Sequence, residues 1–539
     1  DGKKWEPLSK DLPANKFPSR ITKDNAGNLL ICYVGGLTFN GTGGGIYKYN
    51  TTTGEVTNIS PTENSFGACM ANPNNNDQLI ATTCGVWSTN RWSEEDGAWG
   101  DWLYRSEDGG KTWTEYYPGK MGEYKWNAET GEMVQEQVID YLDANGCSWV
   151  YGKAIHWSGS LIINPKDFDQ IMVSSGNGIF KWDGIWGDSP KASFCAQGIE
   201  EVVALDMVSV PGGAAYSAIG DYDGFIHTDV DKPATQYVPN MGSTGAIAYC
   251  PQNPKVMVRI AENQNDIAPG FYSTDGGKTW TKMANSAGGK AAITQLDKDT
   301  YRIFLGKKDS GDLSYSDDWG QTWNACTALG TGGASGTVAL SANGSTMLWA
   351  PNSTKAETYV SNDNGKTWYV ANGLGFQPKM AADKVNPSKI YAACGGQVFA
   401  SEDGGFNFAP TGALVSDTTT LYTVDGREGH VWALSGSIIM FSQDGGKTFE
   451  NLKNFNARAM GFGAPKNAGD YPVLYAMGSS DNVNGIFRSA DQGKTWQRIN
   501  DDKHQFGNIT PYISGDGSVY GKVYFATNGR GIVMGDIAE

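Results

Sequence analysis

The apolar residues of this chain fall into short runs, and turn-forming residues separate one run from the next. Runs such as LLICYV at 29–34 and IYAAC at 390–394 have the length of single β-strands. They are bounded by Gly, Asn, Asp and Ser, which favour tight turns. A helical spacing of apolar residues is nearly absent, and 135–146 is the only helix-like segment. The pattern predicts an all-β chain of many short antiparallel strands.

One motif recurs along the chain and sets its period. The pattern is S-x-D-x-G-x-T-W, and it first occurs as SEDGGKTW at 106–113. In this pattern the Asp carboxylate can accept backbone N–H groups across a turn, Gly supplies a positive φ, and Trp begins the next strand with a buried ring. Later aspartates at the same motif position are Asp275, Asp318, Asp363, Asp403, Asp444 and Asp491. The intervals between these six are 43, 45, 40, 41 and 47 residues, about one four-stranded propeller blade each.

Weaker versions of the motif continue this period upstream. Asp229 and Asp183 precede Asp275 by successive steps of 46 residues, and each follows a strand-like run. Asp108 and Asn50 mark two earlier blades, and the opening DGKKWEPL has the pattern of the second half of one more motif. We therefore expect the chain to begin inside a blade and to be a fragment or a processed chain.

These positions predict tandem seven-bladed β-propellers, of which the first is incomplete in this chain. The seven positions from Asp229 to Asp491 give a second propeller over 196–510. The four upstream positions give about four blades of a first propeller over 1–195. The C-terminal strands at 511–539 lack a fourth strand, and we expect them to close the first propeller.

Composition narrows the classes of partner. The net charge of −16 argues against nucleic acid and anionic membranes as partners. The sequence contains no run of 18 apolar residues, so no membrane span is predicted. The eight cysteines are scattered without a CxxC pair. A metal site is therefore not expected, and most cysteines are interpreted as buried thiols, with one or two disulfides left open. We expect no cofactor, and sequons such as the one at Asn40 fit a secreted protein.

Two long loops concentrate aromatic residues on one face of the predicted propellers. The loops are the segment 86–102, between the second and third strands of a blade, and an insertion at about 116–156, between blades. Aromatic rings with interleaved polar groups suit sugars, which present apolar C–H faces and hydroxyls; packing of some rings onto the propeller is the alternative. The candidate substrate-binding residues are Trp87, Arg91, Trp92, Trp126, Trp149, Trp157 and Tyr222.

Asp221 and Asp223 lie in a turn between two strand-like runs, on the same predicted face as the aromatic loops. An Asp before Gly in a hairpin is usually a turn former, and we prefer that interpretation for Asp223. For Asp221 the spacing alone leaves a turn-forming and a catalytic role open. His227, in the following strand, is expected to be a packed residue rather than a catalytic one.

The ordered set of motifs resembles glycoside hydrolase family 74, the xyloglucanases. Matching stretches include STNRW, HWSG, GIEE, SAIGDYDGF and the C-terminal GKVYFATNGRGIVMGD, and the recurring motif is the Asp-box of this and other families. The resemblance implies two seven-bladed propellers with a substrate cleft between them. It also implies inverting endo-hydrolysis of the β-1,4-glucan backbone of plant cell-wall xyloglucan or a related β-glucan.

The same resemblance implies that Asp221 is the general acid, because it matches the aspartate of the family's GD-x-x-GF segment. Inversion also needs a general base, with the two carboxyl groups about 6.5–9.5 Å apart. The family's partner aspartate lies in a first-blade segment that this sequence does not contain, so no residue here is matched to the base. We expect the 539 residues to be inactive unless that N-terminal segment is associated.

Other classes share parts of this pattern. A catalytically inactive propeller that binds polysaccharide would carry the same aromatic loops and the same Asp221, and it is the second hypothesis. A sortilin-type receptor would show a membrane span and a cysteine-dense segment, and neither is present in this sequence. A sialidase needs an arginine triad, whereas this chain is poor in arginine and has no FRIP-like opening motif.

Overall fold

The computed structural model describes most of the chain. The described residues are 2–36, 43–86, 100–116, 124–127, 132–135, 142–150, 155–188, 190–199, 202–229, 231–262, 270–284, 286–308, 310–331, 335–506 and 509–537. They form two compact units, Asp1–Asn127 with Val134–Glu201, and Ala128–Met133 with Val202–Glu539. The main division after Glu201 lies six residues beyond the predicted boundary at 195.

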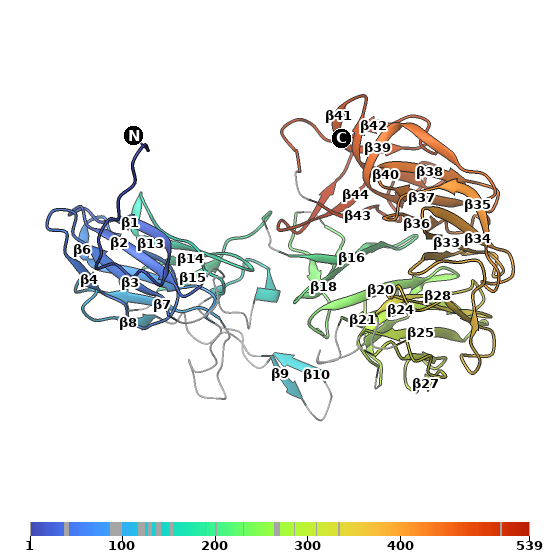
Figure 1. The fold of residues 1–539 in the computed structure, drawn as a ribbon, viewed down its shortest axis with the longest axis horizontal. Helices are drawn as coiled ribbons and strands as arrows, with labels where there is room; N and C mark the ends of the chain where they lie inside the picture. The colour runs from blue at the N-terminus through green and yellow to red at the C-terminus, as the bar shows by residue number, and fades with distance from the viewer. Residues whose placement is uncertain are drawn as a thin grey trace. The chain divides into compact units, whose positions relative to one another are not determined.

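The blades of the first unit are sheets in which four consecutive strands pair antiparallel, each with the next along the chain (Figure 1). Its first blade contains β1 (Phe17–Lys23), β2 (Leu29–Val34), β3 (Gly45–Tyr49) and β4 (Val56–Asn58). The second contains β5 (Phe66–Asn72), β6 (Asn75–Thr83), β7 (Leu103–Ser106) and β8 (Thr114–Tyr116). The third contains β12 (Leu161–Asn164), β13 (Asp167–Ser175), β14 (Gly178–Asp183) and β15 (Lys191–Phe194).

The described part of the insertion is built from short strands and one helical turn. Its elements are β9 (Tyr124–Asn127), β10 (Glu132–Gln135), β11 (Leu142–Asp143) and the 3₁₀ helix η1 (Ser148–Val150). β9 pairs with β10, and β11 lies parallel to β15 at the edge of the third blade. The described ends of the helix-like segment 135–146 are thus strand and turn, because sheet pairing satisfies their backbone groups.

The opening residues do not form a blade. Residues 2–16 contain no strand, and Trp5 is 88% exposed. The opening residues match the second half of an Asp-box, which forms a hairpin only with a strand that precedes it. The described residues contain no such strand. The first unit therefore has three blades in its described part, which corrects the expectation of about four.

The second unit carries the remaining motif positions. Its first three blades contain β16 (Ala204–Ser209), β17 (Ala215–Ile219), β18 (Asp223–His227), β19 (Thr235–Gln236), β20 (Thr244–Cys250), β21 (Asn253–Ala261), β22 (Gly270–Ser273), β23 (Thr281–Lys282), β24 (Gly289–Gln295), β25 (Tyr301–Lys307), β26 (Leu313–Ser316) and β27 (Asn324–Ala325). The next two contain β28 (Gly336–Leu340), β29 (Met347–Pro351), β30 (Tyr359–Ser361), β31 (Tyr369–Val370), β32 (Lys379–Ala382), β33 (Ile390–Cys394), β34 (Gln397–Ser401) and β35 (Ala409–Leu414).

A seven-stranded sheet and a three-stranded sheet follow. The seven-stranded sheet contains β36 (Thr420–Thr423), β37 (Val431–Ser435), β38 (Ile438–Ser442), β39 (Glu450–Gly463), β40 (Val473–Ser480), β41 (Val483–Ser489) and β42 (Gln497–Arg498). The long β39 pairs first with β38 and then with β40, so it is the fourth strand of one blade and the first strand of the next. The three-stranded sheet contains β43 (Ile509–Gly515), β44 (Val523–Thr527) and β45 (Ile532–Gly535).

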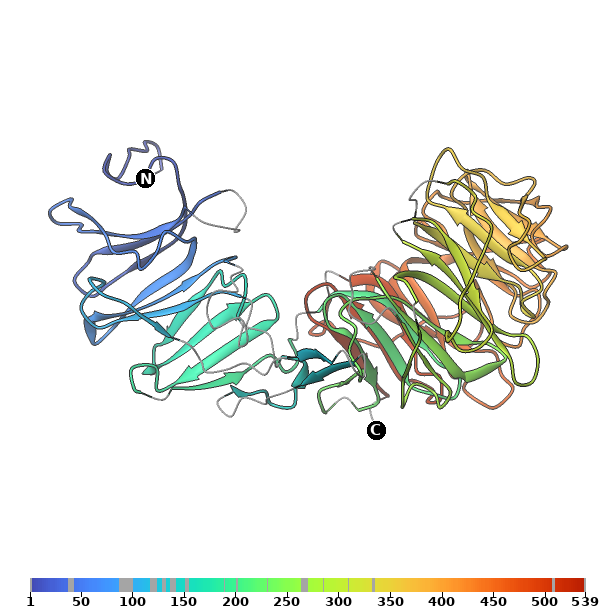
Figure 2. The ribbon, with the colours of Figure 1, turned by 90° about the horizontal axis from the view of Figure 1, so that it is seen from below.

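The C-terminal strands lie in the second unit, not the first. β43 packs against β16 on one side and β39 on the other, and Figure 2 shows these red strands returning beside the green ones. Ile513 is buried with Ala459 and Tyr475, and Ser514 Oγ donates to the carbonyl of Phe462 at 2.9 Å. The C-terminal strands therefore bury their apolar side chains against blades of the second unit. The expectation that they close the first propeller is wrong.

The Asp-box turns have the predicted chemistry. Asp108 lies between β7 and β8, the third and fourth strands of its blade. Its carboxylate accepts from the Thr112 N–H at 2.9 Å and the Thr112 hydroxyl at 2.6 Å, while Ser106 Oγ accepts the Gly110 N–H at 2.9 Å. Trp113 Nε1 donates to the Ile59 carbonyl at 2.7 Å, which ties the turn to the preceding blade. Similar bonds recur at Asp275, Asp318, Asp363, Asp403, Asp444 and Asp491.

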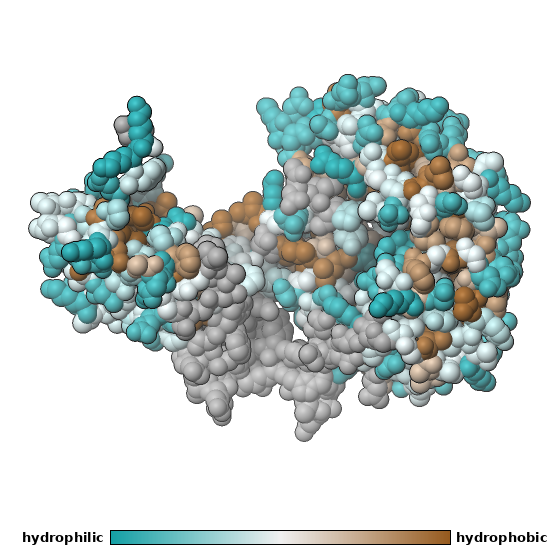
Figure 3. Space-filling view, in the orientation of Figure 1, coloured by the Kyte–Doolittle hydropathy of each residue, from teal (hydrophilic) through white to brown (hydrophobic). Residues whose placement is uncertain are grey.

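Apolar side chains remain exposed at the outer faces of the first unit. Phe17 and Ile21 of β1 are 43% and 55% exposed, and Ile162 and Met172 face each other across β12 and β13 at 51% and 39%. Figure 3 shows hydrophobic surface in the region of β1 and β13. Faces of this kind in a propeller are normally covered by neighbouring blades.

The structure also bears on the cysteines, on possible metal ligands and on possible membrane spans. All eight cysteines lie in the described residues and are free thiols, six of them buried. Within the described residues there is no cluster of His, Cys, Asp and Glu arranged to hold a metal ion. The same residues include no helix with the length and apolarity of a membrane span.

Candidate functional site

The hairpin between β17 and β18 presents Asp221. Ile219 pairs with Asp223 across the two strands, which leaves a three-residue loop with Asp221 at its centre. Asp221 and Asp223 have φ values of +66° and +61°. Asp tolerates this left-handed region better than most residues, because its short side chain can bond to nearby backbone. The local sequence GDYDG therefore produces a tight turn with an aspartate at its tip.

Three hydrogen bonds fix the backbone of this loop. The Asp221 N–H donates to Ser243 Oγ at 2.8 Å, and the Tyr222 N–H donates to the Gly220 carbonyl at 2.8 Å. Gln236 Nε2 donates to the Tyr222 carbonyl at 2.9 Å. The Asp221 side chain itself is exposed. The arrangement holds the main chain in place and leaves the carboxyl group accessible to a substrate.

Beneath the loop, Asp223 forms a buried ion pair with Arg259 of β21. Both side chains are fully buried. The Asp223 carboxylate also accepts from the Thr244 hydroxyl and from the Met241 N–H. Burial raises the pKa of Asp223, and Arg259, Thr244 and Met241 act in the opposite direction. Asp223 is therefore a structural anchor, which extends its expected role as a turn former.

Arg259 is itself held among aromatic rings. Its guanidinium carbon lies 4.2 Å from the Phe271 ring centroid, 4.9 Å from that of Trp280 and 5.0 Å from that of Tyr237. These distances are within the range of cation–π attraction. The pair and its aromatic surroundings give the Asp221 loop a rigid base. Sequence reasoning missed Arg259, since it lies inside an ordinary strand run, VMVRI.

His227 is packed, as expected. Its Nε2 lies 2.9 Å from Ser217 Oγ, and burial lowers its pKa to about 4. The imidazole is therefore neutral near pH 7 and bonded within its own blade.

Asp221 and the Asp-boxes lie at opposite ends of the blade strands. Asp221 follows β17, a second strand, whereas the box positions, such as Asp275, follow third strands. In antiparallel blades these two kinds of turn lie on opposite faces. The boxes are therefore structural, and the face with Asp221 is the candidate functional face of the second unit.

The predicted aromatic residues divide by burial. Trp157 is 53% exposed and has a φ of +49°. Trp149 is only 5% exposed and packs edge-on against Phe194 at 5.3 Å, and Tyr222 is 7% exposed. About half of the Trp157 surface is exposed, whereas Trp149 packs the insertion onto its blade, which is the alternative interpretation.

Other predicted residues cannot be placed. Trp87, Arg91 and Trp92 lie outside the described residues. Trp126 belongs to β9, but its side chain also lies outside the described part. These four residues stay predictions.

A second carboxylate, Asp101, fastens the bases of both aromatic loops in the first unit. It is 1% exposed and accepts from the N–H groups of Gly85, Val86 and Ser158 at 3.1, 2.9 and 2.9 Å. The Thr83 hydroxyl completes the set at 2.9 Å. Because Ser158 follows Trp157, this carboxylate fixes the chain that carries the exposed ring. Its place among loop residues gave no sequence signal.

The blades, the box turns and the Asp221 loop define an Asp-box β-propeller with a candidate carboxylate on its functional face. The BNR/Asp-box repeat model matches residues 271–282. A xyloglucanase of Paenibacillus sp is 32% identical over 97% of this chain and 48% of its own length. A xyloglucanase of Acetivibrio thermocellus is 33% identical over 93% of this chain and 55% of its own. The chain thus spans about half the length of these curated relatives.

Solved structures give the same relationship. The family 74 enzyme of Niastella koreensis is 30% identical, with a TM-score of 0.71 over 99% of this chain and 69% of its own. A family 74 xyloglucanase of Xanthomonas campestris matches with the same TM-score and coverage at 28% identity. The chain belongs to glycoside hydrolase family 74.

Proposed function

We propose that the parent protein is an inverting endo-β-1,4-glucanase that cleaves the backbone of xyloglucan. The observation that carries this proposal is the Asp221 loop, an exposed carboxyl group on a hydrogen-bonded turn of a family 74 propeller. Its relatives in Paenibacillus and Acetivibrio are xyloglucanases by name. Xyloglucan is neutral, so the strongly acidic character of the chain does not oppose its binding.

In the proposed mechanism Asp221 is the general acid. Its protonated carboxyl gives a proton to the leaving glucosidic oxygen while water attacks the anomeric carbon from the opposite face. The exposed position lets the group meet the polymer, and the rigid backbone limits the entropy lost when the reacting atoms align. Asp223 does not serve as the base, because its carboxylate is buried and bonded to Arg259.

The partner base is proposed to come from an N-terminal segment of the parent protein. Sequence matching assigns no residue of this chain to that role. Activation of water by a carboxylate on the opposite side of the sugar requires a separation of about 6.5–9.5 Å from the acid. The 539 residues alone are then expected to bind the polymer but not to cleave it.

Hydrolysis is tested by the release of reducing sugar from tamarind xyloglucan by the native protein. The Asp221→Asn variant should lose at least about 10²-fold in rate. Asp481→Asn is the matched control, since Asp481 lies in the equivalent β40–β41 turn with a φ of +50° and is also exposed. Full activity in Asp221→Asn would overturn the assignment. A native protein that binds xyloglucan but releases no sugar would instead be a polysaccharide-binding propeller.

A further inference from the structure

A polar cavity of about 330 Å³ lies in the second unit, close to the Asp221 loop. Its lining comes from the starts of the first strands and the ends of the second strands of successive blades, the same strand ends that carry the Asp221 turn. A cavity of this size is at the small end of ligand pockets. Its residues include Leu205, Glu262, Lys290, Lys308, Ser335, Thr337, Asn352, Gln377 and Lys379.

The cavity shares a wall with the Asp221 loop. Ser243 Oγ accepts the Asp221 N–H at 2.8 Å, and the Ser243 carbonyl accepts the Glu262 N–H at 2.8 Å. The Leu205 side chain, which also lines the cavity, lies near Gly220, the residue before Asp221. The wall that Leu205 and Glu262 form is therefore the part of the cavity that adjoins the Asp221 loop.

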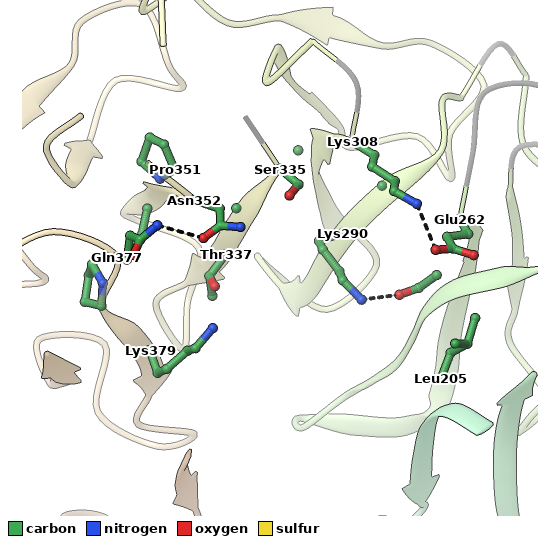
Figure 4. Close-up of a pocket in the computed structure, with 16 residues that line it drawn as sticks. Leu205, Glu262, Lys290, Lys308, Ser335, Thr337, Pro351, Asn352, Gln377 and Lys379 are labelled. Atoms are coloured by element: carbon green, nitrogen blue, oxygen red, sulfur yellow. Dashed lines mark hydrogen bonds and ion pairs between the residues drawn. The ribbon is translucent and has the colours of Figure 1, made fainter. Parts of the chain in front are cut away.

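Three lysines face this cavity in a strongly acidic chain. Lys308 Nζ pairs with Glu262 at 2.8 Å, and Lys290 Nζ donates to the Gly245 carbonyl. Lys290 also opposes the rise in pKa that burial gives Asp206. Two of the three ammonium groups thus have a carboxylate nearby. Figure 4 shows Lys379 on the opposite side of the cavity from Lys290 and the Lys308–Glu262 pair.

Lys379 supplies the excess positive charge. It begins β32 and is exposed, and within the described residues no ion pair or side-chain hydrogen bond is formed by its ammonium group. Lys379 is thus the lining lysine that has no carboxylate partner among the described residues. A ligand with one carboxylate would provide that partner.

The other lining groups are suited to sugar hydroxyls. Gln377 Nε2 donates to Asn352 Oδ1 at 2.9 Å, so the amide pair is pre-positioned (Figure 4). The hydroxyl-bearing residues Ser335 and Thr337 lie nearby. Two lining positions, Gly289 and Gly336, require glycine because a Cβ there would lie within 3 Å of the backbone of the adjoining strand.

We propose that this cavity binds a uronic acid, with the sugar carboxylate at Lys379 and its hydroxyls at the Asn352–Gln377 amide pair. The inference rests on the proposed function for its choice of a saccharide ligand. It extends the substrate class to glucans that carry an acidic branch.

The test is calorimetric titration of the whole chain with sodium glucuronate, glucose and sodium acetate. Glucuronate should bind at least about tenfold more tightly than glucose, since a charge-assisted hydrogen bond is added. It should also exceed acetate, which has the charge but no hydroxyls. The Lys379→Met variant should lose the preference for glucuronate over glucose. Lys366→Met, at an exposed lysine of an Asp-box turn, should keep it.

Equal binding of glucuronate and glucose, or no binding of glucuronate, would overturn the proposal. Equal binding of acetate would show a simple anion site instead. An unchanged preference in Lys379→Met, with an unchanged thermal unfolding midpoint, would also contradict it. Glucuronate contains no glucan bond, so its failure to bind would leave xyloglucan hydrolysis standing, and loss of hydrolysis in Asp221→Asn would leave this test unaffected.

Discussion

Asp221 and Asp223, which are separated by one residue in the β17–β18 turn, have different roles. Asp221 points its carboxyl group to solvent, whereas Asp223 is buried against Arg259. The same residue type thus serves reaction and structure, and the environment decides which. The sequence could indicate the turn, but not the burial of Asp223, because its partner lies 36 residues further along the chain.

Removal of the buried partner should be costly. We expect Asp223→Ala to lower the free energy of unfolding by about 3–5 kcal/mol, because Arg259 would remain buried and unpaired. Asp229→Ala, which removes an exposed pair with Lys232, should leave it nearly unchanged, because solvent screens such a pair. Urea unfolding of both variants provides the measurement. Equal effects would show that the pair is not the base of the loop.

The two tryptophans at 149 and 157 should separate packing from binding. Trp149→Ala should lower the free energy of unfolding by about 3–5 kcal/mol, as expected for a buried aromatic side chain. Trp157→Ala should leave stability nearly unchanged and weaken oligosaccharide binding by roughly 1 kcal/mol, about fivefold, since about half of the residue's surface is exposed. Unfolding and calorimetric titration measure the two effects, and unchanged binding in Trp157→Ala would remove this residue from the site.

At the scale of elements, the Asp-box turn is the repeated unit that holds the blades together. Hydrogen bonds from Thr112 lower the pKa of Asp108 to about 2, and hydrogen bonds from Thr448 do the same for Asp444. A carboxyl group whose pKa is lower in the folded state stabilises that state above its unfolded pKa of about 3.9. This contribution is lost as the pH falls through the folded value.

Stability should therefore fall between about pH 4 and pH 2. The Asp444→Asn variant should show a smaller loss over this interval than the wild-type chain, because one of the titrating groups is gone. Urea unfolding midpoints at pH 6 and at pH 2.5 make the comparison. A pH dependence identical to that of the wild type would show that this turn does not take part in acid unfolding.

The regular elements were predictable, and the exceptions have physical causes. The period of the boxes located the blades from Asp229 onwards, since each turn needs the same Asp, Gly and Trp at fixed spacing. The path of the C-terminal strands was not predictable, because it depends on contacts of β43 with β16, such as the hydrogen bond from the Tyr512 hydroxyl to the Leu205 carbonyl, which joins residues 307 positions apart. The hydrogen bonds of Asp101 to both aromatic loops were also not predicted, since a single aspartate in a loop has no distinctive sequence pattern.

For the whole molecule, the two units are unequal. The second unit carries Asp221 and the blades with regular boxes, whereas the first has three blades in its described part and exposed apolar faces on β1, β12 and β13. Those faces support the proposal that further blades of the parent protein cover them and bring the general base. The candidate acid and the buried Asp223–Arg259 pair that supports its loop, by contrast, both lie within this chain.

The most direct test of the central claim compares two substrates for the native protein and its Asp221→Ala variant. One substrate is xyloglucan. The other is an aryl glycoside of a xyloglucan oligosaccharide, from which an acidic phenol leaves as the phenolate and needs no proton. A general acid at Asp221 predicts a loss of about 10²–10⁴-fold on xyloglucan and a much smaller loss on the aryl glycoside. An equal loss on both substrates, or no loss on either, would contradict the role of Asp221 as the proton donor.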